Sequence, residues 1–92
     1  MSKLTISKAI GQLAGTVRKL YLITQDATTA IEKEFADNYL ETLESMLVEQ
    51  LVYYLPKSEQ LVILRENELR YLFDELMRKN EEKDSIEVGL DI

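Results

Sequence analysis

The run ISKAIGQLAGTVRKLYLITQDATTAI, residues 6–31, repeats apolar or short side chains at alternating intervals of four and three residues. This spacing is a heptad pattern, which predicts one continuous seam along a single helix. The pattern continues less regularly through Phe35, Tyr39 and Leu43. A helix from residue 6 to residue 35 would be about 45 Å long, so its far end would need a partner. The seam consists of Ile6, Ile10, Leu13, Val17, Leu20, Thr24, Ala27 and Ile31.

Two places in the sequence could end this first helix. One is the stretch 24–29, whose last residue forms a capping box with Glu32. The other is the pair 37–38, whose last residue forms a capping box with Glu41. We favour the second place, because the heptad seam passes the first without interruption.

The rest of the chain up to residue 80 predicts two more helices. The second helix should run over residues 38–55 and stop at Pro56, which cannot continue a helix. The third should span residues 59–79, with Ser58 as its N-cap. So short a connection makes the two helices antiparallel neighbours. The fold class we expect is all-α: residues 1–80 form a three-helix antiparallel bundle with a long first helix, completed by dimerisation.

Residues 81–92 differ in composition from the helical part. They contain five acidic residues and a single base, Lys83. Four of their apolar residues alternate with acidic residues or glycine, which is the period of a half-buried strand. We expect an acidic, mobile or extended C-terminal tail that could add a strand to the sheet edge of a partner. The residues of this candidate docking tail are Ile86, Val88, Leu90 and Ile92.

The end of the second expected helix and the start of the third are apolar on nearly every side. A helix that is apolar all round must be buried all round, and three helices of this length cannot surround one another. We therefore expect the corner between them, together with the seam, to meet a protein partner or a second copy of the chain. The candidate residues of this surface are Leu13, Val17, Met46, Val48, Val52, Tyr53, Leu55, Leu61 and Ile63.

Composition excludes several kinds of chemistry. The chain contains no His and no Cys, which excludes zinc, haem and iron–sulfur sites built on those residues, and triads that need them. Glu41 and Glu44 form an ExxE motif, but Tyr71 stands where a second motif ending at Asp74 would need its first acid. We interpret these carboxylates as a solvated face. The sequence predicts no catalytic, metal or cofactor site, no small-molecule ligand and no enzyme.

Charge is unevenly distributed along the chain, whose net charge is −6. Residues 1–30 carry four basic residues and one acid, whereas residues 31–60 carry two basic residues and seven acids. The net charge disfavours nonspecific nucleic-acid binding. A weak resemblance over residues 10–20 to the start of a helix-turn-helix would place basic side chains in a DNA groove. A DNA-binding protein of this kind would use Lys8, Arg18 and Lys19, exposed together as one basic ridge.

These observations lead to two functional hypotheses. The first is a non-enzymatic protein–protein interaction module acting through apolar helical surface, such as a small adaptor, chaperone, inhibitor or immunity-type regulatory protein of bacterial or phage origin. The alternative is a dimeric, helix-turn-helix-like DNA-binding regulator. No stretch has the roughly 18 apolar residues of a membrane span, and we expect a cytoplasmic protein.

Overall fold

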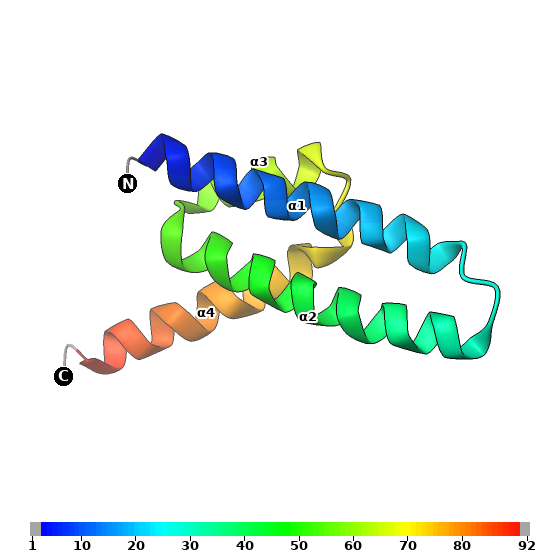
Figure 1. Ribbon diagram of the computed structural model, residues 1–92. Coiled ribbons are helices and arrows are strands. Elements are labelled where there is room, and N and C mark those ends of the chain that lie inside the picture. The colour runs from blue at the N-terminus through cyan, green and yellow to red at the C-terminus, as the bar shows by residue number, and fades with distance from the viewer. Residues whose placement is uncertain (1–2, 91–92) are drawn as a thin grey trace.

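The computed structural model describes the backbone of residues 3–90 and the side chains of residues 5–85. That part of the chain is all-α, as expected, and contains no strand (Figure 1). It forms two helical hairpins, and its dimensions are 52 × 28 × 21 Å. The elements are α1 (Lys3–Gln25), α2 (Ala30–Tyr54), α3 (Lys57–Glu66), the 3-10 turn η1 (Arg70–Leu72) and α4 (Phe73–Leu90).

The first helix ends at Gln25, and our prediction of a break at residues 37–38 was wrong. The chain turns at residues 26–29, and the Thr29 hydroxyl caps α2 by accepting a hydrogen bond from the backbone N–H of Glu32 at 3.1 Å. This reversal lays α2 back along α1 (Figure 1). It lets Leu40 pack into the core, where it is 7% exposed. A single straight rod would have left that half of the chain without a partner.

The second helix ends as the sequence predicted. It stops at Tyr54, and the N–H of Leu55 donates to the carbonyl of Leu51 at 3.1 Å. Pro56 itself is the N-cap residue of α3, so α3 begins at Lys57, slightly earlier than expected. The tight connection directs α3 back under α2.

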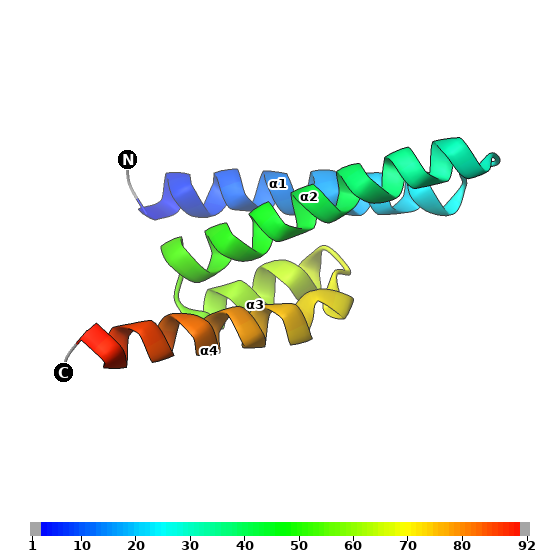
Figure 2. The same cartoon turned by 90° about the horizontal axis from the view of Figure 1, so that it is seen from below.

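The expected third helix is broken into two, so the described residues 3–90 contain four α-helices instead of the expected three-helix bundle. At the end of α3, the N–H of Leu69 donates to the Leu64 carbonyl at 2.8 Å, and that of Glu68 to Arg65 at 3.1 Å. These are the two hydrogen bonds of a Schellman motif, in which one residue adopts a left-handed conformation. That residue is Glu68, with a φ of 57°. The chain then reverses, and α4 runs back beside α3 (Figure 2).

Residues 81–90 continue α4 as helix and do not form the extended segment that we expected. A strand needs a partner strand for its backbone groups, and residues 3–90 offer none. Ion pairs support the helix instead: Glu82 lies 3.7 Å from Lys79, and Asp84 lies 3.2 Å from Lys57 of α3. Residue 92 lies outside the described residues, as do the side chains of the other three residues of the candidate docking tail.

The core lies where both hairpins meet. Val17 of α1, Leu51 of α2, Leu64 of α3 and Leu76 of α4 are each at most 1% exposed. Beyond this core, the end of α1 and the start of α2 extend past α3, η1 and α4, as both views show (Figures 1 and 2). We call this protruding part, residues 22–39, the arm.

Candidate functional site

Most of the surface expected to meet a partner lies inside the fold. The structure buries five of its nine residues in the core of a single chain: Val17, Val48, Val52, Leu55 and Ile63. Leu13 is partly buried against the same core. The reason is the second hairpin, which the sequence analysis treated as one straight helix: by folding back, α3 and α4 cover the apolar end of α2. Only Met46, Tyr53 and Leu61 remain exposed among these candidates, by 43%, 57% and 43%.

A different set of apolar side chains is exposed on α2. Ile31, Phe35 and Tyr39 are 81%, 76% and 55% exposed. Their spacing of four residues places them in line on one helical face, and we call them the α2 row. Met46 and Tyr53 follow on the same face, within a sector of about 80°. The opposite face of α2 packs into the core, so α2 is apolar on two opposite sides, and the side of the α2 row is exposed over residues 31–39.

The α2 row was missed because its residues fit the continuation of the first seam. Their heptad spacing is genuine, but the turn at residues 26–29 reverses the chain. Val17, before the turn, is 0% exposed, whereas Ile31, after it, is 81% exposed. A usable signal was present in the sequence: the capping box of Thr29 and Glu32 marks the start of a new helix.

Acidic residues border the α2 row. At about 100° per residue, Glu32 lies on one side of the row, and Glu34 and Glu41 lie on the other. All three are exposed. The base in this part of α2, Lys33, points to the opposite side of the helix. Within the described residues, none of these four side chains forms an ion pair.

A cluster of carboxylates lies between α2 and α4. Glu41 and Glu44 of α2 line an open cavity together with Asp74 and Glu75 of α4. Burial is the main cause that raises the pKa of Glu44 above its usual 4.5, and Glu41 adds to the shift, while a hydrogen bond donated by the Tyr71 hydroxyl opposes it. Among the described residues, no group of three or more acidic side chains has a geometry that could hold a metal ion.

Tyr71 connects this cluster to the first helix. Its ring stacks on that of Tyr21, with the centroids 5.2 Å apart. The guanidinium of Arg18 lies 5.4 Å from the centroid of the Tyr21 ring. Burial, and then the contact with Glu44, raise the pKa of Tyr71. These contacts make the cluster a structural junction between α1, α2 and the start of α4.

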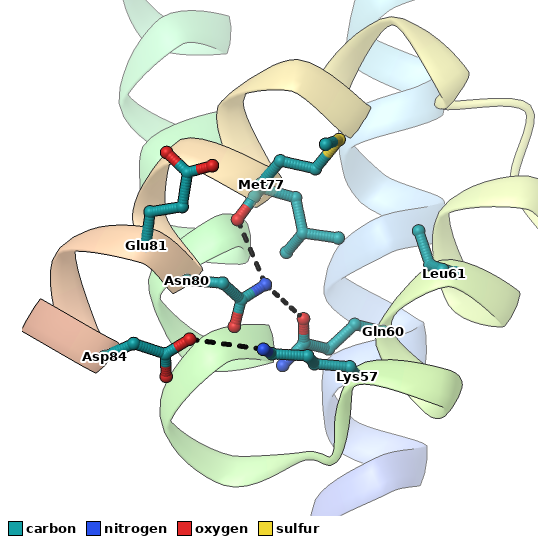
Figure 3. A pocket seen from close by; sticks show the side chains of 8 residues that line it. Lys57, Gln60, Leu61, Met77, Asn80, Glu81 and Asp84 are labelled. Carbon is teal, nitrogen blue, oxygen red and sulfur yellow. Dashed lines mark hydrogen bonds and ion pairs between the residues drawn. The ribbon is translucent and has the colours of Figure 1, made fainter.

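A second concave feature is a groove between α3 and α4, shown in Figure 3. Leu61, Leu76 and Met77 contribute its apolar surface. At its base the side-chain amide of Asn80 donates to Gln60 Oε1 at 2.8 Å, and the Gln60 amide donates to the Leu55 carbonyl at 2.8 Å. The amide of the buried Gln60 is therefore satisfied at both ends, and the groove offers apolar contact rather than an unpaired polar group.

The basic residues of the DNA-binding alternative lie on a helix without a turn. α1 is continuous from Lys3 to Gln25, so the turn expected within residues 10–20 does not exist. Lys8 and Lys19 are exposed. Arg18 instead forms an ion pair with Glu68 at 2.9 Å. One member of the expected basic ridge is thus already engaged within the chain.

Comparison with known proteins found no similar protein. No protein-family model matches the chain, and neither the curated proteins nor the solved structures contain a match. Within residues 3–90, no helix combines the length and the apolar character needed to cross a lipid bilayer.

Proposed function

We propose that this protein is a non-enzymatic protein–protein interaction module and that it binds its partner through the α2 row. The observation that carries the proposal is the exposure of Ile31, Phe35 and Tyr39, at 81%, 76% and 55%, in line on a helix whose opposite face forms the core. Large apolar side chains at intervals of four residues are the anchors by which a helix and an apolar partner surface recognise each other. A cytoplasmic adaptor, chaperone or inhibitor would act in this way.

The size of the apolar contact is adequate for a modular interaction. Burying a side chain of the size of Ile or Phe contributes about 1.5–3 kcal/mol. Three such anchors contribute on the order of 5 kcal/mol or more, against which the entropy cost of association must be set. Met46 and Tyr53 lie on the same face and could lengthen the contact. Interface anchors are enriched in aromatic residues, which fits two of the three members of the row.

The arm also presents the α2 row in an accessible way. It extends past α3, η1 and α4, so a partner can approach the row without displacing another helix (Figure 2). The DNA-binding alternative receives less support, because Arg18 is held by Glu68 and the acidic arm would repel a phosphate backbone. Dimerisation remains a prediction. If it used the α2 row, a second copy of the chain would compete with a different protein for the same side chains.

The test is site-specific photo-crosslinking in cells that naturally produce the protein. A photoreactive amino acid replaces Phe35 in one variant and Gln12, which is exposed on α1, in a matched control. We expect a crosslinked adduct larger than the free chain at position 35 and none at position 12. Adducts at neither position, or equal adducts at both, would rule out recognition through the α2 row.

A further inference from the structure

We infer that the partner surface for the α2 row is an amphipathic helix whose apolar face is bordered by Lys or Arg. This inference rests on the proposed function and adds the chemistry of the partner. It comes from the charges around the row rather than from the row itself. Three exposed acids of α2 border the apolar side chains, and no base of α2 does. Arg78 of α4 lines the cavity beside Glu41, but its guanidinium pairs with Glu75 and Glu82.

The positions of these acids define where the partner's bases must lie. Glu34 and Glu41 are separated by seven residues, or two helical turns, and form one edge of the row. Glu32 forms the other edge, near the tip of the arm. Its carboxylate accepts a hydrogen bond of 3.5 Å from the Thr28 hydroxyl and forms no ion pair within the described chain. Lys and Arg side chains can lay their methylene stems along an apolar surface while the charged end reaches an acid at its edge.

A second copy of this chain fits the α2 row less well than a basic helix. In a two-fold symmetric dimer, the same patch of each subunit faces itself. If two α2 helices paired in antiparallel orientation, the edge of Glu34 and Glu41 would face the same edge of the other copy. Like charges placed opposite each other destabilise a helix pair. Lys33, on the opposite side of α2, cannot compensate.

The dimensions of the arm suit a helical ligand. From Ile31 to Tyr39 the α2 row is about 12 Å long, which a partner helix of three to four turns would cover. Because neither α3 nor α4 reaches this part of α2 (Figures 1 and 2), the partner helix can lie along α2 over its whole length. Longer partners would continue toward Met46, which is 43% exposed.

The inference is tested with three synthetic peptides of about 20 residues and the full-length purified chain. The first peptide has Leu on one helical face and Lys on the flanks. The second has the same Leu face with Glu in place of Lys, and the third is a scrambled version of the first. Binding is measured by fluorescence anisotropy at low and at high salt. We expect the Lys peptide to bind at least about tenfold more tightly than the Glu peptide, with a difference that shrinks in high salt.

Matched variants locate the binding on the α2 row. Phe35→Ser removes one anchor without adding charge, and we expect it to weaken the Lys peptide about tenfold or more. Its control is Ile23→Ser, which changes an apolar residue of α1 that is 61% exposed. The pair Glu34→Gln and Glu41→Gln should weaken binding about fivefold. Its control, Glu66→Gln with Glu81→Gln, changes the net charge equally away from the row and should leave the affinity unchanged.

The outcomes separate the partner chemistry from the proposed function. Equal affinity for the Lys and Glu peptides, with both weakened by Phe35→Ser, would overturn the basic partner and leave the interaction module standing. If Phe35→Ser leaves the affinity for the Lys peptide unchanged, the binding is purely electrostatic, and the inference is overturned. Self-association that Phe35→Ser abolishes would assign the row to a second copy and overturn a foreign partner. If no peptide binds and no crosslink forms at position 35, the proposed function itself is rejected.

Discussion

The guanidinium of Arg18 in α1 lies 2.9 Å from a carboxylate oxygen of Glu68, and Glu68 has a backbone φ of 57°. This ion pair joins the first helix to the turn that separates α3 from α4. The carboxylate end is 74% exposed, so the pair contributes about 1 kcal/mol or less. The left-handed backbone of Glu68 costs about 1–2 kcal/mol for a residue with a β-carbon.

Substitution at this turn should separate the two effects. Glu68→Ala removes the ion pair and keeps the backbone strain, whereas Glu68→Gly removes both. We expect the Gly variant to be more stable than the Ala variant by about 1 kcal/mol, as measured by urea denaturation. A Gly variant no more stable than the Ala variant would show that the chain does not reverse through a left-handed residue here.

The start of α2 depends on one hydroxyl group. The side chain of Thr29 accepts the hydrogen bond from the Glu32 N–H, so Thr29→Ala should lower the free energy of unfolding by about 1 kcal/mol. Thr28→Ala is the matched control, because the hydroxyl of Thr28 makes only a 3.5 Å contact with the carboxylate of Glu32 and caps no backbone group. Similar losses of stability in the two variants would contradict the assignment of Thr29 as the N-cap residue of α2.

The two faces of α2 should respond differently to truncation. Leu51 is 0% exposed, and Leu51→Ala should lower the free energy of unfolding by about 2–5 kcal/mol through lost burial and a cavity. Phe35 is 76% exposed, and Phe35→Ala should change it by less than about 0.5 kcal/mol. Thermal and urea denaturation measure both values. A large loss for Phe35→Ala at low concentration would place that side chain in a core.

The polar contact between α3 and α4 should also contribute to stability. In Asn80→Ala the Oε1 atom of Gln60, a residue only 2% exposed, loses its donor. We expect a loss of about 1–2 kcal/mol. Asn38→Ala makes the same change at an exposed position in the middle of α2 and should be neutral or slightly stabilising, since Ala favours the helix. Equal losses of stability in the two variants would contradict a buried hydrogen bond between Asn80 and Gln60.

Glu44 should make stability depend on pH in a defined direction. Its pKa in the folded chain is raised above 4.5, chiefly by burial, so the folded state holds the proton more tightly than the unfolded state. Its stabilising contribution is then complete below pH 4.5 and is lost as the pH rises through the raised value. The melting temperature of Glu44→Gln should therefore increase relative to that of the wild type as the pH rises through this value. A difference that stays constant with pH, or that Glu34→Gln reproduces, would contradict this assignment.

For the residues assigned to a partner surface, exposure was predicted correctly at some positions and wrongly at others. Met46, Tyr53 and Leu61 are exposed, which a partner surface requires. Val52 and Ile63 were assigned to the same surface but are buried. The error came from the turn at Glu68: glycine usually marks a left-handed position, and here a glutamate occupies it. No composition rule singles out this position.

The local features of the sequence were sufficient for the helical class and for the end of α2, because helix periodicity and the stop at Pro56 depend on a few neighbouring residues. The choice between the two capping boxes was different. Both are locally sound, and the one at Thr29 is used because reversal there lets Leu40 and Leu47 pack against α1. That gain exists only when distant segments meet, and it is also what turns Ile31, Phe35 and Tyr39 outward.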